Sequence, residues 1–434
     1  MIYFRKTGAS WALAAAVGAG SIALSAPASA EVVISKSDGW EVFTQGRVNA
    51  FFSYGAGDAL PIARPGETIP QGGGLDPSSD TIPPPNDPAT GMPPAGVQGS
   101  FKSMRVRSGF VPNQLGIGLR RQENDDLTLS AYIGIWATIE SEAMRKATKV
   151  FADAREGYGK IDSKRYGSLV VGKALELFSR GAVENDFLYH DGYALGYPGN
   201  IDNTGPTNGM IGFGVLAAFF APGFMYTTPD LAGLKLSVGI YDPTTSAGNF
   251  EATRYARPEG ELTYDLASGS TTKVHIFVNG AQQLFYKAST NDSKSAYGVG
   301  YGGRLEVGPV HLGVAGHYGK GLGLNYAFEP GSVAVTQDGQ LRFFDGYSAF
   351  AQVVAGRVDI NAGWGMSRVM ALPVDRAAGS NVSLPTQQAI SGGIVFHATP
   401  HLHLDLDVIH GMNKWSLGEH QNFNFVNAGV IVTW

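Results

Sequence analysis

Residues 401–409 read HLHLDLDVI, and their apolar and polar side chains alternate one by one. Such a period of two indicates a β-strand, because successive side chains of a strand point to opposite faces of the sheet. The apolar face carries Leu402, Leu404, Leu406 and Val408. The polar face carries His401, His403, Asp405 and Asp407. These four polar residues could gather a metal cation, but we interpret them as the solvated lining of a barrel.

The same alternation recurs along the chain. Residues 422–434 read NFNFVNAGVIVTW, and residues 41–54 and 127–140 follow the pattern as well. The apolar face of the last segment carries Val426, Ala428, Val430, Val432 and Trp434. Many of these strands are ten or more residues long, whereas strands of soluble proteins usually have about 5–6 residues. A soluble β-sandwich with one wet face would also alternate, so the length of the strands favours a transmembrane barrel.

Short and long connections between the expected strands also alternate. We expect short turns at 123–126, 230–233, 306–310, 355–358 and 398–401. Long loops are expected at 141–156, 176–220, 324–342 and 373–387. Bacterial outer-membrane barrels combine short periplasmic turns with longer external loops in this way. The sequence therefore predicts an all-β fold, an antiparallel transmembrane barrel of about sixteen strands.

Composition agrees with a membrane barrel. Charged residues make up 16% of the 434 residues, there are 59 glycines, and cysteine is absent. The absence of cysteine excludes thiol catalysis and cysteine-based metal sites. Residues 1–30 combine Arg5 and Lys6, an apolar stretch and the sequence Ala28-Ser29-Ala30, so we expect a cleaved secretory signal peptide. Cleavage would leave 30 basic and 37 acidic residues in a single domain, 31–434.

Beyond the expected signal peptide, no segment resembles an uncharged apolar helix of about 20 residues. A membrane-spanning chain of this kind has to form a closed barrel, because lipid offers no partner to backbone polar groups. Two long segments stand out between the expected strands. Residues 55–100 are crowded with proline and glycine and are expected to form an elongated external loop, and residues 176–220 are long enough to be functional.

Four stretches of the sequence resemble the general porins of Gram-negative outer membranes. They are DGWEVFTQGRVNAFFSYG (38–55), QENDDLTLSAYIGIWATIES (122–141), YGSLVVGKALELF (166–178) and TTPDLAGLKLSVGIY (227–241). The resemblance implies a homotrimer of sixteen-stranded barrels whose third external loop folds inward and narrows the channel. Residues 176–220 match that loop. The terminal Trp434 resembles the signal that the outer-membrane assembly machinery recognises.

In this family, acidic residues of the inward loop lie opposite basic residues of the wall. The resemblance implies the acidic set Glu176, Glu184, Asp186 and Asp191. It implies the basic wall set Arg47, Arg105, Arg107, Arg120 and Lys173. Lys173 replaces an arginine of the family pattern, which preserves the charge but loses the bidentate fork. Met225 stands just before Tyr226, where family members often have another arginine.

We therefore expect a porin of the bacterial outer membrane that passes small hydrophilic solutes and ions by diffusion. Its expected partners are the lipid bilayer, lipopolysaccharide and the assembly machinery, with no cofactor, metal or nucleic acid. A substrate-specific channel is the alternative within transport, and it would show an aromatic slide or a block of conductance by sugar. A barrel hydrolase and a plugged structural or adhesive barrel are alternatives from other classes. No G-x-S-x-G nucleophile motif supports the hydrolase.

Overall fold

The computed structural model describes residues 31–61, 67, 81–82, 84–91, 98–137, 139, 152–188, 209–243, 246–247, 250–251, 254–268, 271–287, 291–328, 334–336, 338–377 and 379–434. The expected signal peptide, most of the segment 55–100, and Asp191 lie outside these ranges. Among the residues described, no helix is both long enough and apolar enough to cross a membrane.

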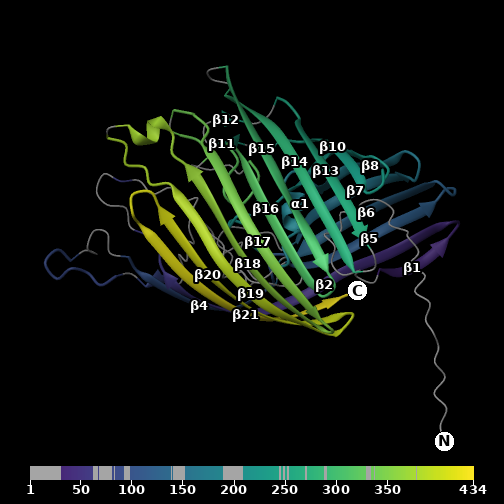
Figure 1. Cartoon of the computed structure of the whole chain (residues 1–434), viewed down its shortest axis with the longest axis horizontal. Coiled ribbons are helices and arrows are strands. Elements are labelled where there is room, and N and C mark those ends of the chain that lie inside the picture. Colours follow the sequence, from purple (N-terminus) through teal and green to yellow (C-terminus); the bar gives the residue numbers. More distant parts are fainter. Residues whose placement is uncertain are drawn as a thin grey trace, which may run out of the picture.

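Sixteen antiparallel strands form a closed barrel, which confirms the predicted fold (Figure 1). The second strand of the wall is interrupted after Arg107 and resumes at Asn113, so it carries two labels. The first half of the wall consists of β2 (Trp40–Asp58), β4 (Ser100–Arg107) with β5 (Asn113–Gln122), β6 (Leu127–Ala137), β7 (Ala152–Ser163), β8 (Gly167–Leu175), β9 (Phe220–Thr227), β10 (Leu234–Tyr241) and β13 (Arg257–Ser268).

The second half of the wall has longer strands and continues around to the first strand. It consists of β14 (Thr272–Lys287), β15 (Asp292–Val307), β16 (Val310–Lys320), β17 (Phe343–Ala355), β18 (Val358–Met370), β19 (Pro385–Thr399), β20 (Leu402–Trp415) and β21 (His420–Thr433). Shorter elements lie outside this count: β1 (Val32–Ser37), β3 (Thr81–Ile82), β11 (Ser246–Ala247), β12 (Phe250–Glu251), α1 (Arg180–Glu184) and the 3-10 helix η3 (Pro373–Arg376).

The barrel closes between β2 and β21. Arg47 pairs with Thr433 at one end of this seam and Gly57 pairs with Phe423 at the other. Beyond the seam, Gly46 exchanges two backbone hydrogen bonds with Trp434, at 2.8 and 3.0 Å. The short strand β1 then continues the same edge of β2, because Val32 pairs with Thr44. The strand β1 is an element that the sequence pattern did not predict.

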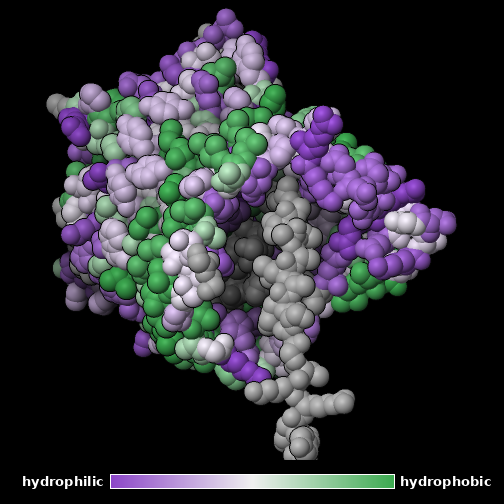
Figure 2. Space-filling model, turned by 45° about the vertical axis from the view of Figure 1, so that its right-hand side comes forward, coloured by the Kyte–Doolittle hydropathy of each residue, from purple (hydrophilic) through white to green (hydrophobic). Residues whose placement is uncertain are grey.

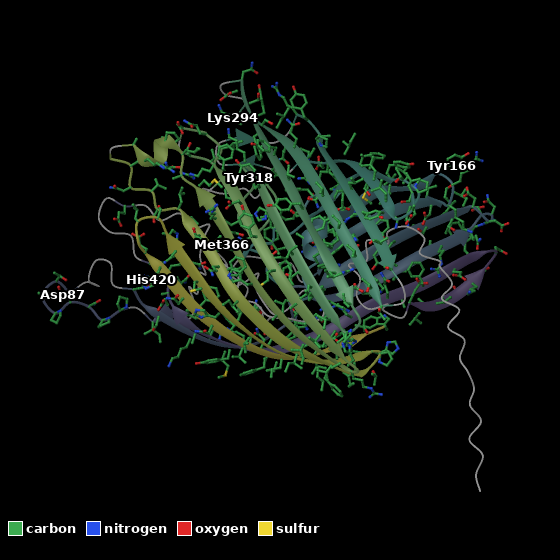
Figure 3. The ribbon with its side chains drawn as sticks, in the orientation of Figure 1. Asp87, Tyr166, Lys294, Tyr318, Met366 and His420 are labelled. Atoms are coloured by element: carbon green, nitrogen blue, oxygen red, sulfur yellow. The ribbon has the colours of Figure 1, made fainter. Side chains whose placement is uncertain are left out.

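The two ends of the barrel differ in the length of their connections. The predicted short turns follow β5, β9, β15, β17 and β19 and all lie at one end. The long loops lie at the opposite end. In Figure 3, Tyr166, in the turn between β7 and β8, lies far from Lys294, His420 and Asp87, which mark the long-loop end. This asymmetry assigns the short turns to the periplasmic end by the rule for bacterial barrels.

Alternation along the strands separates an outer apolar face from an inner polar one. On β20, the outward positions Leu404, Leu406 and Val408 are 42%, 50% and 50% exposed. The inward positions between them, Asp405 and Asp407, are buried. A broad part of the wall in Figure 2 is accordingly hydrophobic, with hydrophilic side chains gathered toward its upper margin. The outer face therefore has the surface that a lipid bilayer requires.

Several element boundaries differ from those expected. β2 continues to Asp58 and β4 begins at Ser100, so the Pro/Gly-rich connection is shorter than the expected 55–100. β7 begins at Ala152, within the expected loop 141–156, because a bulge at Arg155 lets the strand continue pairing with β6. β9 begins at Phe220, the last residue of the expected loop 176–220. Of these strands, β7 and β9 had weak alternation, which is why the pattern placed them imprecisely.

Candidate functional site: the lumen and its inward loops

Three of the five predicted basic wall residues face the lumen on neighbouring strands. Arg47 lies on β2, and Arg105 and Arg107 lie on β4, opposite Ser53 and Phe51 of β2. Arg47 and Arg107 are 6% and 9% exposed, whereas Arg105 is half-buried. The alternation of these strands explains the placement, because their intervening residues, such as Val106, are exposed on the outer face.

Arg120 also faces inward, but it belongs to a local ion-pair network near the periplasmic end. Its Nη2 lies 2.6 Å from Glu31 Oε1 and 2.7 Å from Glu41 Oε2. The guanidinium also lies over the ring of Phe43, 5.2 Å from its centroid. The cation is therefore balanced by two carboxylates on the rim, away from the inward loop.

Lys173 does not have the position that the resemblance implied. It pairs with Gly157 of β7 and shares the outward alternation of Val171, which is 38% exposed. Its Nζ donates to the carbonyl oxygen of Ala154 at 3.0 Å and lies 3.8 Å from Asp153 Oδ1. The sequence around Lys173 resembles the family motif, but the alternation of side chains along β8 places the amine of Lys173 on the outer face.

The loop between β8 and β9 folds into the barrel over its described residues, 176–188 and 209–219, as predicted for residues 176–220. Its described part forms one apolar cluster with inward-facing residues of the wall. The loop contributes Ala182, Val183, Leu188, Met210, Ile211, Phe213 and Val215. The wall contributes Phe277, Ala315, Phe350, Ala389, Ile409 and Phe423. The loop is therefore held against β14 to β21 chiefly by hydrophobic packing.

Close contacts with the wall fix the inner part of this loop. The backbone N–H of Gly214 donates to Ser367 Oγ at 2.8 Å, and Gln387 Nε2 donates to the carbonyl oxygen of Gly212 at 2.8 Å. A side chain at Gly365 would overlap the carbonyl oxygen of Phe213. Glycine is required at this wall position because the loop backbone lies directly against the strand.

Asp186, a predicted acidic filter residue, serves as an internal anchor of the loop. Its carboxylate accepts hydrogen bonds from the backbone N–H of Leu188 at 2.9 Å and of Met210 at 2.5 Å. The side chain is buried, and this burial raises the pKa of Asp186 to about 7 even though both donors favour the ionised form. Asp186 thus connects the two described parts of the loop.

Glu176 lies in a buried charge cluster at the start of the loop. Arg257 on β13 is fully buried and forms ion pairs with both Glu176 and Glu259. Glu259 also accepts hydrogen bonds from the backbone N–H groups of Leu177 and Phe178, at 2.9 and 2.8 Å. One arginine between two carboxylates therefore ties the loop to the wall.

Glu184 is the acidic loop residue that stays accessible, with 35% of its side chain exposed. It lies 4.0 Å from Arg180 on the helix α1, and Arg180 is also paired with the buried Glu261 of β13. Arg304 of β15 donates to the carbonyl oxygen of Glu184 at 3.3 Å. Of the described acidic candidates, Glu184 is thus the one with a carboxylate open to the lumen.

A second loop, between β16 and β17, also folds inward, which the sequence did not predict. The backbone N–H of Ala217 donates to the carbonyl oxygen of Asn325 at 2.8 Å, and the rings of Phe219 and Tyr326 stack 4.7 Å apart. Arg342 at the end of this loop forms a buried bidentate pair with Asp375, at 2.9 and 3.1 Å. Two loops therefore narrow the lumen together.

The wall carries further charged residues that face the lumen and that the family resemblance did not imply. Arg257, Glu259 and Glu261 lie at every second position of RPEGELTY (257–264), so the alternation rule could have assigned them to the lumen. Arg155 is the extra residue of the β7 bulge, and its guanidinium lies 4.9 Å from the ring centroid of Trp136. A bulge changes the parity of a strand, so the sequence carried no signal for Arg155.

Of the two histidines of the opening stretch, His403 lines the periplasmic half of the lumen, whereas His401 lies exposed in the turn before β20. His403 is buried, and its ring lies 4.6 Å from that of His397, which is paired with Asp359 at 2.8 Å. Asp407 accepts a hydrogen bond from Asn427 at 2.8 Å. Within the described ranges, no three histidine or carboxylate side chains converge to form a metal site.

Comparison with solved structures identifies the fold class. The outer membrane channel DcaP of Acinetobacter baumannii superimposes with a TM-score of 0.64 and 13% identity, over 93% of this chain and 100% of that chain. OmpF of Salmonella typhi, in complex with daunomycin, gives a TM-score of 0.55 and 11% identity over 93% and 100%. A loop-deletion mutant of the outer membrane protein OmpT of Vibrio cholerae gives 0.51 and 12% over 92% and 100%.

No family of protein sequences matches the chain, and no curated protein matches it either. At these identities, the structural matches establish the fold alone. The chain has the closed sixteen-stranded fold of outer-membrane porins, as the sequence resemblance predicted. This fold and the apolar outer face of the barrel correspond to a protein of the bacterial outer membrane.

Proposed function

We propose that the chain is a porin through which small hydrophilic solutes and ions diffuse passively. The observation that carries this proposal is the described part of the loop, residues 176–188 and 209–219, which is folded into the barrel beside a lumen wall bearing Arg47, Arg105 and Arg107. The space-filling view shows a hollow that opens to the surface of the molecule (Figure 2). Opposed fixed charges in such a passage favour hydrated polar solutes and adjust the preference among ions.

The proposal includes a homotrimer embedded in a bilayer with lipopolysaccharide, inserted by the outer-membrane assembly machinery. It assigns the filter to Glu184 on the loop and to the three lumen arginines, and gives Asp186 and Glu176 anchoring roles. It includes no catalytic activity and no cofactor. Trp434 supports the insertion role because its backbone pairs with Gly46 and its ring covers that glycine at the barrel seam.

Planar-bilayer recording of the purified full-length protein tests the proposal. We expect conductance in steps, with closures in groups of three for a trimer, and a finite reversal potential in a salt gradient. Well-folded protein that inserts but conducts no ions would contradict the proposal and favour a plugged structural barrel. A substrate-specific channel remains the second candidate, because the lumen wall carries an ordered row of aromatic rings.

A further inference from the structure

The lumen face of β2, β5, β6 and β7 carries three aromatic residues in one row. Phe43 pairs with Gly118, Gly118 pairs with Tyr132, and Tyr132 pairs with Tyr158 on the next strand. The rings of Tyr132 and Tyr158 have centroids 5.6 Å apart and an interplanar angle of 38°. Both tyrosines are partly exposed, whereas Phe43 is 9% exposed. The register thus places three rings in one row, and the accessible ring surface of this row belongs to Tyr132 and Tyr158.

Glycines beside these rings hold them close to the sheet. A Cβ atom at Gly118 would overlap the ring of Phe43, and one at Gly116 would overlap the hydroxyl end of Tyr132. A Cβ atom at Gly134 would lie 3.1 Å from Tyr132 Cε1. The rings therefore lie along the wall, over positions where other residues would place a side chain. Glycine in a strand often marks a close approach of this kind.

Polar side chains border the aromatic row on both sides. Toward the long-loop end, the adjacent row contains Gln45, Gly116, Gly134 and Glu156. Toward the short-turn end, it contains Glu41, Arg120, Ser130 and Lys160. Gln45 Nε2 donates to the hydroxyl oxygen of Tyr132 at 3.1 Å, which fixes one edge of the row. Donors and acceptors thus lie two positions along each strand from the ring row, which is the spacing of neighbours on one face.

Carboxylates outnumber cations in this border, because Glu156 on the long-loop side adds to the paired groups on the short-turn side, and this excess disfavours anionic solutes. Arg120 is paired with Glu31 and Glu41, and Lys160 is paired with Asp162 at 2.8 Å. Each cation has a carboxylate partner, so the row offers an anion little net attraction. A solute that binds favourably to this surface has a flat apolar face and many neutral hydroxyl groups. Pyranose sugars combine these two properties, because axial C–H groups cover one face of the ring.

We propose that the row of Phe43, Tyr132 and Tyr158 is a binding track for neutral saccharides inside the channel. The sugar rings stack on the tyrosines, and Gln45, Glu156 and Lys160 exchange hydrogen bonds with the hydroxyl groups. Such a site follows the usual composition of small-ligand sites, with aromatic surface and a few placed polar groups. This inference rests on the proposed channel function and names a solute class for it.

Maltotriose added to one side of a bilayer with the conducting wild-type channel is the test. We expect a dose-dependent reduction of the ionic current, with an apparent dissociation constant that rises about tenfold in the double variant Tyr132→Leu, Tyr158→Leu. The single variant Tyr132→Phe keeps the ring and is expected to keep most of the block. Tyr301→Leu is the matched control, because Tyr301 lies on the outer face and is 43% exposed.

The two proposals fail in different ways in this experiment. A channel that conducts ions but whose current maltotriose leaves unchanged overturns the saccharide track and leaves the porin proposal intact. A block that Tyr301→Leu weakens as much as the double variant also overturns the track, since the effect would not depend on the row. Loss of all conductance in wild-type protein would instead contradict the porin proposal. Resistance to SDS at room temperature verifies that each variant is folded.

Discussion

Asp186 illustrates how a residue of the expected type can have an unexpected role. The family resemblance assigned its carboxylate to the solute path, but both of its oxygens accept backbone N–H groups within the loop. A short acidic side chain readily forms such local bonds, and they leave no sign in the sequence pattern. Glu184, two residues earlier, is the last residue of α1, and its side chain stays partly exposed.

The stability of the inward loop is expected to decrease as the pH rises. Burial raises the pKa of Asp186 from its ordinary 3.8 to about 7 in the folded protein, so folding favours the protonated carboxyl. The contribution of the protonated Asp186 to the free energy of unfolding is therefore present at low pH. It is lost between about pH 4 and pH 7, by an amount on the order of a few kcal/mol. Single-channel recordings at pH 5 and pH 8 should show more current flicker at pH 8.

The variant Asp186→Asn is the control for this pH effect. Its amide oxygen can accept one of the two backbone hydrogen bonds, and the side chain does not titrate. The difference in flicker between pH 5 and pH 8 should therefore be smaller in the variant than in the wild type. An equal pH dependence in both proteins would show that another group is responsible.

Arg107 is expected to influence ion preference directly. A unit charge acts on an ion 10 Å away in water with about 0.4 kcal/mol, which is about a twofold change in local concentration. Arg107→Gln should therefore increase the ratio of cation to anion permeability by about fourfold, because the two ions respond in opposite directions, and a reversal potential in a salt gradient measures this ratio. Arg121→Gln is the matched control, because Arg121 lies over Trp40 outside the lumen-facing positions. Equal shifts in both variants would argue against a role for Arg107 in the filter.

Strands with clear alternation could be predicted from the sequence, and strands with an irregularity could not. β16 to β21 lie between the expected turns and loops to within a few residues, because each has one lipid face and one lumen face over its full length. β7 was misplaced because its bulge at Arg155 interrupts the period of two. The inward path of the loop between β16 and β17 depends on distant contacts such as Ala217 with Asn325, which a local pattern does not contain.

The inward loop depends on the absence of a side chain at Gly365 of β18. Gly365→Ala should displace the segment around Phe213, because the new methyl group would overlap a backbone carbonyl that cannot rotate away. We expect an altered single-channel conductance and a lower melting temperature, by a destabilisation of about 1–3 kcal/mol. Gly260→Ala on β13 is the control, since the nearest atom to its new Cβ would be 3.8 Å away. A Gly365→Ala channel with wild-type conductance would contradict the docked position of the loop.

The two faces of the barrel are expected to respond oppositely to an added charge. Leu406→Lys on the outer face of β20 should destabilise the folded protein in a bilayer by about 2–4 kcal/mol, because lipid solvates the amine poorly. Thr263→Lys on the inner face of β13 should have little effect, since Glu261 and Asp265 flank that position. Urea titration of both variants in vesicles measures the difference. Equal destabilisation would contradict the assignment of the faces.

The seam between β2 and β21 joins segments from opposite ends of the sequence, as the pairing of Arg47 with Thr433 shows. All other neighbours in the wall are consecutive strands, so this seam contributes the contacts of greatest sequence separation. Such contacts incur a large loop-closure entropy and form slowly. Until they form, the sheet has two unpaired edges that can recruit strands from other chains. The final closure step is therefore the stage of folding at which misassembly between neighbouring molecules competes most strongly.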